Sequence, residues 1–363
     1  MPANRGYKRL CESIGRGDLD QLKERAAEDP ESVRHWKPVV DAAFAGRADM
    51  LSALLDAGAD ANAVSGVSAR HTPLTRIAQH HSTIPKHAGH IEAMRLLLAR
   101  GADPNLAAGP HGFVPLAYSA MAADQEQMAA LMEAGTTIDM HLAAILLDTG
   151  RLCGFLDEDA NPNAVDARGR SPLHYVALSG LWQERSKAAI ECAELLLSRG
   201  ADVNSAEEMA EGDEVFHATA LWRTLSWQRN LALAELLLER GADPNPAAFT
   251  ATFDGGDDVC DLLDRYGTDW EQRFHGRTPL MDLMHFRRPA GAAWLIRRGV
   301  DVNAKAPDGR TALHYAAWQG VRADYVEALL AAGAERKARD ADGKTPLDLA
   351  VEKKRTKLLQ VLG

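Results

Sequence analysis

The sequence predicts an all-α solenoid built from helix–turn–helix repeats with short β-hairpin fingers. Two observations predict it: a unit of about 33 residues recurs along the chain, and a small turn residue closes the second helical segment of each copy. A solenoid lengthens in one dimension, so 363 residues can form one continuous domain. The closing residues are Gly58, Gly101, Gly135, Gly200, Gly241, Gly267, Gly299 and Gly333, with Asp29 and Asp159 in the same place.

The best-preserved repeat, at residues 299–335, shows what each part of the unit does. Thr311 can cap the first helix, and the proline of Thr345-Pro346 in the next copy suits the first helical position because no N–H is needed there. Gly333 ends the second helix, where a left-handed residue without a Cβ is favoured. Asp308-Gly309 predicts a tight turn at the tip of a finger.

The core of the unit resembles the ankyrin-repeat family. It stands as Thr311-Ala312-Leu313-His314-Tyr315-Ala316 and again as Ser171-Pro172-Leu173-His174, and T-P-L-H-x-A at this period is the ankyrin signature. The resemblance covers the whole chain as ten to eleven repeats. It implies that His174 and His314 make hydrogen bonds inside their repeats. It also implies that the fingers and first helices form a concave face that binds proteins.

The first five repeats follow in chain order. The first, at residues 5–30, is a cap with a polar outer face. Its inward-facing residues are Leu10, Ile14, Leu19 and Leu22. The second lies at residues 37–57, and the third carries insertions at 64–70 and 81–88. The fourth begins at Val114-Pro115-Leu116. The fifth begins at Ile138, so soon after Gly135 that its finger is missing.

The remaining repeats vary in the same two ways, by insertion and by loss of the finger. The sixth has an insertion at 182–187, and the seventh has a long acidic finger at 205–215. The eighth has no finger between Gly241 and Phe249, whereas the ninth and tenth are near-regular. We expect residues 1–363 to form a single domain. Its parts are a cap at 1–36, repeats at 37–341 and a second cap at 342–363.

Composition limits the compartment and the partners. A net charge of −10 argues against nucleic acid and anionic membranes. No 18-residue apolar stretch and no apolar run near the start is present, so we expect neither a membrane span nor a signal peptide. The four cysteines are far apart and predict reduced thiols in a cytoplasmic monomer; they are Cys11, Cys153, Cys192 and Cys260.

The candidate binding residues come from the ankyrin resemblance, which places them at the finger tips and just before the glycine between the helices. That position is large or aromatic in nearly every repeat, as in a partner-binding groove; the alternative is ordinary core covered by the insertions. Trp222 joins the row because a pocket is expected beside the acidic finger, between the two missing fingers. The row is Phe44, His80, Met121, Leu146, Leu178, Trp222, Trp227, Phe253, Phe286 and Trp318.

Metal binding and catalysis are the rival functions. His80, His81 and His87 lie on one insertion but have no recognised ligand spacing, so we expect no metal and no cofactor. An enzyme would use His80, His87 or Asp254 as acid–base groups, with the inserted loops closed over a small substrate. No hydrolase, metalloprotease or phosphate-loop motif occurs. The sequence therefore favours a protein-interaction module, in its sharper form an inhibitor or immunity protein for a partner enzyme.

Overall fold

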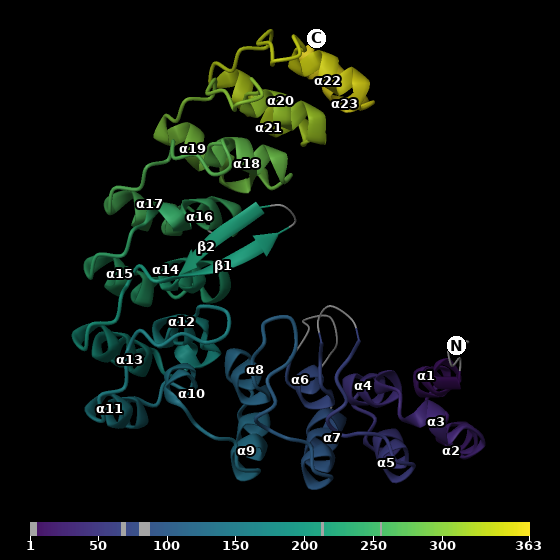
Figure 1. Ribbon diagram of the computed structural model, residues 1–363. Coiled ribbons are helices and arrows are strands. Elements are labelled where there is room, and N and C mark those ends of the chain that lie inside the picture. The colour runs from purple at the N-terminus through teal and green to yellow at the C-terminus, as the bar shows by residue number, and fades with distance from the viewer. Residues whose placement is uncertain (1–5, 67–69, 80–87, 212–213, 255) are drawn as a thin grey trace. The chain divides into compact units, whose positions relative to one another are not determined.

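The computed structural model describes residues 6–66, 70–79, 88–211, 214–254 and 256–363. A few side chains within these ranges, including those of Trp227 and Asp254, also lie outside the described part. The chain divides into two compact units, residues 1–196 and 197–363, here called the N-terminal and C-terminal units. Both consist of paired helices, as predicted (Figure 1).

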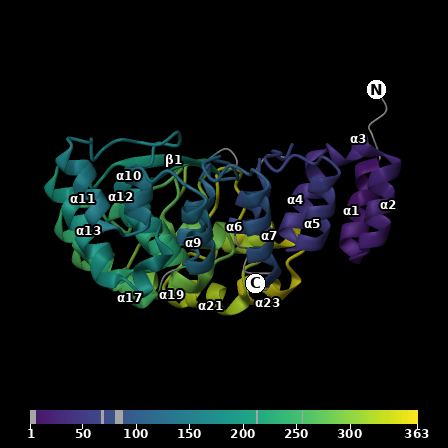
Figure 2. The same cartoon turned by 90° about the horizontal axis from the view of Figure 1, so that it is seen from below.

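The N-terminal unit is two layers of helices. First helices pack on one another in the series α1, α4, α6, α8, α10 and α12, and second helices in the series α2, α5, α7 and α9. Figures 1 and 2 show α1 beside α2 and α4 beside α5. The elements are α1 (Gly6–Arg16), α2 (Leu19–Glu28), α3 (Pro30–Val33), α4 (Trp36–Phe44), α5 (Ala48–Asp56), α6 (Pro73–Ala78), α7 (Ala88–Ala99), α8 (Pro115–Met121), α9 (Gln125–Glu133), α10 (Met140–Ile145), α11 (Thr149–Asp157), α12 (Pro172–Leu178), the 3₁₀ turn η1 (Gly180–Gln183) and α13 (Ser186–Ser198), which reaches the boundary.

The C-terminal unit repeats the two layers and adds a β-hairpin. Within it α16, α18, α20 and α22 pack in series, as do α19, α21 and α23. The elements are β1 (Ala206–Glu211), β2 (Glu214–Thr219), α14 (Ala220–Arg223), the π-helical turn η2 (Thr224–Gln228), α15 (Leu231–Glu239), η3 (Asn245–Ala247), α16 (Ala248–Asp254), α17 (Asp257–Arg265), α18 (Pro279–His285), η4 (Pro289–Gly291), α19 (Ala292–Arg298), α20 (Ala312–Gln319), α21 (Ala323–Ala331), α22 (Pro346–Glu352) and α23 (Thr356–Leu362).

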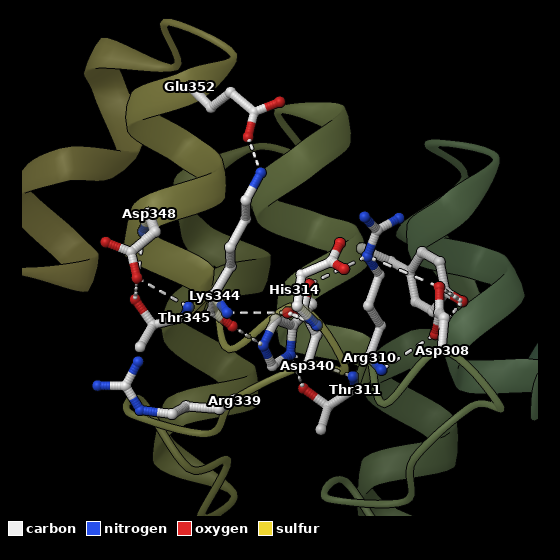
Figure 3. A network of polar contacts seen from close by, with 12 residues as sticks. Asp308, Arg310, Thr311, His314, Arg339, Asp340, Lys344, Thr345, Asp348 and Glu352 are labelled. Carbon is white, nitrogen blue, oxygen red and sulfur yellow. Dashed lines mark hydrogen bonds and ion pairs between the residues drawn. The ribbon is translucent and has the colours of Figure 1, made fainter.

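The first helices begin at the predicted caps. Thr345 Oγ1 accepts a hydrogen bond from the Asp348 backbone N–H at 3.2 Å, while Asp348 accepts one from the Thr345 N–H at 2.9 Å. Thr311 and His314 form the corresponding box one repeat earlier, with the Thr311 N–H donating to His314 Nδ1 at 3.1 Å. Both boxes are drawn in Figure 3. Each box supplies acceptors for two backbone N–H groups that a helix without a cap would leave unpaired.

The predicted glycines end the second helices. All eight have positive φ, between 81° and 95°, which a residue without a Cβ adopts without strain. Asp159 has the same left-handed conformation, with φ 62°. Asp29 also ends its second helix, as the C-cap of α2, but with an extended φ of −137° instead of a left-handed one. Its carboxylate accepts from the Ser32 N–H and so caps the short helix α3 as well.

Asparagines tie consecutive repeats together at the base of the fingers. Asn303 donates to the Gly333 carbonyl at 2.9 Å and accepts from the Glu335 N–H at 2.8 Å. Asn62 and Asn204 make the same pair of bonds to the repeats that follow them. Each asparagine thus pairs one backbone C=O and one backbone N–H of the next repeat, which fixes the position of that repeat relative to its neighbour.

The fingers follow the sequence prediction. The long one is an antiparallel hairpin in which Ala206 pairs with Thr219 and Glu211 with Glu214. Two shorter fingers close with single bridges, Ala108 to Phe113 and Phe274 to Arg277. Residues 136–139 and 242–247 lead into α10 and η3–α16 without a hairpin. We call these two places the first and second notch.

Candidate functional site

The structure separates the predicted binding row into half-buried and buried members. Phe44, Met121, Trp222, Phe253, Phe286 and Trp318 are half-buried. Leu146 and Leu178 are buried, with 6% and 2% of their surface exposed. Ser179 Oγ bonds the Ile145 carbonyl at 2.6 Å, so the chain that enters the sixth repeat's insertion packs against the fifth repeat beside Leu146. His80 lies outside the described residues, as does the Trp227 side chain.

Cationic side chains lie over most of these rings. The Arg76 guanidinium is 3.8 Å from the Phe44 ring centre. Trp318 lies between Arg310, at 4.7 Å, and the Lys353 ammonium, at 3.6 Å. Similar contacts join Arg223 to Trp222, Arg288 to Phe253 and Arg277 to Phe286. A cation over an aromatic face is stabilised by the ring quadrupole. Arg223, Arg277 and Arg310 are also paired with carboxylates, so these contacts hold the rings in place.

A second row of side chains, four residues after each helix cap, fixes the fingers. The Tyr118 hydroxyl donates to the Ala108 carbonyl at 3.0 Å, and the Tyr175 hydroxyl to Asp166 at 2.8 Å. The same position pairs Arg223 with Glu207, Asp282 with Arg277 and Tyr315 with Asp308. We call these contacts finger tethers. In the fifth repeat, which lacks a finger, the position is Ala143.

The first notch is a pocket with charged side chains in a mostly apolar lining. Its volume is about 530 Å³, and Ala117, Asp139, His141, Arg168 and Arg170 are among its lining residues. Ala117 occupies the position of the motif histidine in the fourth repeat, and its small side chain leaves the space of the absent finger open. The volume lies within the range of ligand pockets.

Buried polar contacts hold one wall of this pocket. Asp166 pairs with the buried Arg170 and accepts from Tyr175. Burial alone would raise the pKa of Asp166, but the hydrogen bonds and charge of Arg170 outweigh it and lower that pKa. Burial raises the pKa of Tyr175, so it remains a neutral donor. His141 Nε2 lies 3.1 Å from the Ala164 carbonyl.

The second notch is an apolar pocket. Its volume is about 220 Å³, and its walls include Phe216, Trp222, Phe249 and Phe274. Phe216 and Phe249 are stacked with centres 6.3 Å apart. Phe249 also contacts Phe253 at 4.9 Å, and both contact Phe286. The pocket thus opens beside a continuous cluster of half-buried rings.

The remaining candidates have structural partners or lie outside the described residues. His314 Nε2 bonds the Lys344 carbonyl and His90 Nε2 the Phe44 carbonyl, so both histidines link repeats. In the described ranges no three His, Cys, Asp or Glu side chains are grouped to hold a metal. His81 and His87, like the Asp254 side chain, fall outside those ranges. Glu207 of the acidic finger is 3% exposed and paired with Arg223 rather than solvated.

Sequence reasoning missed the tethers and the cations over the rings. The signal for the tethers was present, because Tyr, Arg or Asp recurs four residues after the cap in five repeats: Tyr118, Tyr175, Arg223, Asp282 and Tyr315. The cations left no such signal. Arg288 and Phe253 stand in different repeats, so their contact depends on how neighbouring helices pack.

Comparison with known proteins agrees with this geometry. The family description "Ankyrin repeats (many copies)" matches residues 295–350, and "Ankyrin repeat" matches 70–108 and 168–207. The chain is an ankyrin-repeat protein. Repeats of this family serve protein–protein interaction, so the chain carries a protein-interaction module. In the described part of the chain, no helix is long and apolar enough to cross a membrane.

Three curated proteins illustrate how far the similarity extends. Mouse Rabankyrin-5 is 37% identical over 20% of this chain and 7% of its own length. Chicken Inversin is 39% identical over 26% of this chain and 8% of its own length. Protein PhlB of Serratia liquefaciens is 33% identical over 40% of this chain and 65% of its own length. The chain therefore spans less than two thirds of each relative.

Proposed function

We propose that the chain is a non-catalytic interaction module that holds a protein partner on its concave face, the face formed by the fingers and first helices. The observation that carries the proposal is the cluster of half-buried rings at Phe249, Phe253 and Phe286, with Trp318 further along the same row. Rigid aromatic side chains provide contact area at low entropic cost and are common binding hot spots.

A sharper form of the proposal is an inhibitor or immunity protein. A module without its own catalytic groups acts by covering the surface of what it binds. In this form the partner is an enzyme whose active site is occluded on binding. A titration of the captured partner with the purified chain should then abolish its activity at one equivalent.

Substitution of Trp318 tests the proposal. We expect Trp318→Ala to weaken partner binding by more than about 2 kcal/mol, measured with a partner captured from the native host. Met132→Ala is the matched control, because Met132 is an exposed apolar residue on a second helix, 42% accessible. Circular dichroism should show the same helicity in both variants. Unchanged affinity together with lower thermal stability would mean that Trp318 is a core residue.

A second candidate function uses the first notch. Its volume and its convergent Asp139, Arg168 and His141 support binding of a small polar molecule, as an enzyme or small-molecule carrier would require. Arg168→Ala should abolish such binding and leave partner capture intact. A partner lost in Trp318→Ala but kept in Arg168→Ala would favour the interaction module over this alternative.

A further inference from the structure

We propose that a pocket between the inter-helix loops of the tenth repeat and the C-terminal cap binds a run of carboxylate side chains, an acidic segment of the protein partner. The inference rests on the proposed function and specifies the chemistry of one part of that partner. The pocket has a volume of about 520 Å³, and its charged lining residues are Arg322, Asp324, Lys354, Arg355 and Lys357. We call it the basic pocket.

The basic pocket differs in charge from the other pockets described. Its four cations and one carboxylate give a net charge of +3, so the rest of a chain with net charge −10 carries −13. Two arginines and two aspartates line the first notch, and His217 is the ionisable residue of the second. A pocket on α17 and α19 has three aspartates against two arginines. Among these four pockets, positive charge is therefore concentrated in the basic pocket.

The two lysines of the basic pocket are available to an anion. Lys354 and Lys357 are exposed, and neither ammonium has an ion-pair partner among the described residues. By contrast, Arg322 pairs with Asp324 at 2.8 Å, and Arg355 Nε donates to a backbone carbonyl at 3.2 Å. An acidic ligand would thus meet ammonium groups that the chain itself does not neutralise.

These cations stand where they oppose the chain's own helices. The corresponding helix caps of the first, fourth and fifth repeats are aspartates that accept from a backbone N–H: Asp18, Asp124 and Asp148. The caps of α21 and α23 are Arg322 and Arg355, and neither side chain bonds its helix. Lys357 lies in the first turn of α23, where a positive charge opposes the helix dipole. Local stability therefore does not account for the cations, and departures from such local rules concentrate at functional sites.

The kind of cation favours a chain of carboxylates over a single phosphate. Both arginines already donate to protein groups, so the groups left open are ammoniums, compact point charges without the planar fork that fixes one phosphate. One exposed ion pair is worth only about 0.2–1 kcal/mol, so a ligand with several charges along a chain gains most. The negative charge of the rest of the protein opposes nucleic acid and anionic membranes.

The basic pocket adjoins the row of rings at Trp318. Gly320, which follows the helix that carries Trp318, lines the pocket. The carbonyl that accepts from Arg355 belongs to Trp318, and the Lys353 ammonium lies 3.6 Å from the centre of its ring. A partner seated on Trp318 therefore reaches the basic pocket with the residues beside that contact.

The test uses the whole chain and a fluorescent acetyl-hexaglutamate amide, so it needs no identified partner. In anisotropy titrations at about 0.02 M salt, where surface charges are screened little, we expect this peptide to bind and its hexaglutamine counterpart not to bind. Lys354→Gly with Lys357→Ala should weaken hexaglutamate binding about tenfold, because two exposed ion pairs are lost.

That double variant should keep its urea midpoint. Lys354 has φ 56°, which glycine adopts without strain, and loss of Lys357 removes a charge that opposes the helix dipole. The matched control is Lys8→Ala with Lys23→Ala, which removes two exposed lysines from the first repeat. We expect it to change hexaglutamate binding by less than about twofold.

Four outcomes would overturn the inference. Absence of hexaglutamate binding, or an equal loss in the control variant, would show that the pocket does not select acidic segments. Displacement of the peptide by an equal concentration of inorganic phosphate would assign a single-anion site, and tighter binding of an oligonucleotide of equal charge a nucleic-acid surface. All four leave the proposed function standing if Trp318→Ala still loses the partner. Conversely, the expected peptide result with an unaffected Trp318→Ala variant would overturn the proposed function alone.

Discussion

His314 shows at the scale of one residue how the ankyrin core works. Its Nδ1 accepts from the Thr311 N–H, and its Nε2 donates to the Lys344 carbonyl at 3.2 Å (Figure 3). The first bond requires the neutral ring with its proton on Nε2, whereas a protonated ring would still donate the second. The side chain is fully buried, and this burial lowers its pKa below the usual value. Protonation of His314 would therefore break its bond to the Thr311 N–H, which caps the helix within the repeat.

The first prediction follows from that lowered pKa. The unfolded His314 takes up a proton below about pH 6.5, whereas the folded ring resists it, so stability is complete above this pH and is lost as pH falls. We expect the urea midpoint to drop between pH 7.5 and 5.5. His314→Asn should be less stable but show a smaller drop, because its amide does not titrate. Equal drops in both proteins would show that other groups cause the pH dependence.

At the scale of elements, the sequence predicted what local motifs determine. The start of a helix at Thr345-Pro346 and the helix ends at the glycines depend only on neighbouring residues. The two missing fingers follow from the short distance between a glycine and the next repeat core. The tether positions recur in the sequence, but the partner of each tether could not be predicted from it. Glu207 meets Arg223 only because the strand register turns Glu207 toward α14. The short helix α3 was missed since Asp29 both ends α2 and caps the helix that follows directly.

The candidate site was predictable to the same extent. Half-buried rings at Phe253, Phe286 and Trp318 fit the position before the inter-helix turn, a local feature of the repeat. A pocket was expected between the two notches, near Leu178, Trp222, Trp227 and Phe253. Trp222 lines a pocket at the second notch, but Leu178 and Phe253 do not. Phe274 and Gln272 were not expected, since they reach the notch from the finger of the ninth repeat. Such contacts depend on stacking, which spacing along the chain does not encode.

The second prediction tests a tether. Arg223 and Glu207 are 5% and 3% exposed, so removal of one partner leaves a buried charge. We expect Arg223→Met to destabilise the C-terminal unit by about 3–5 kcal/mol. The double variant Arg223→Met with Glu207→Leu should recover most of this loss, because no buried charge remains. Chemical denaturation measures both. A double variant as unstable as the single one would show that the pair stabilises through more than mutual neutralisation.

At the scale of the whole molecule, stability in a repeat protein is approximately a sum of repeat and interface terms. The near-regular repeats after Thr278 combine capping boxes, left-handed glycines and the two hydrogen bonds that Asn303 makes to the next repeat. The fifth and eighth repeats lack fingers, and η2 interrupts the first helix of the seventh with a π-helical turn. Local stability should therefore vary along the chain, and unfolding should depart from two-state behaviour.

The last prediction concerns the order of opening. Hydrogen exchange should show residues 138–267 opening before the block from Thr278 to Ala350, because the finger-less repeats lack the contacts that a finger makes with its neighbours. Uniform protection along the chain would contradict this. It would mean that the buried pairs of Arg170 with Asp166 and Arg223 with Glu207 compensate for the missing fingers. Rigid walls around both notches are what a preformed ligand pocket requires, so that result would strengthen the small-molecule alternative for the first notch.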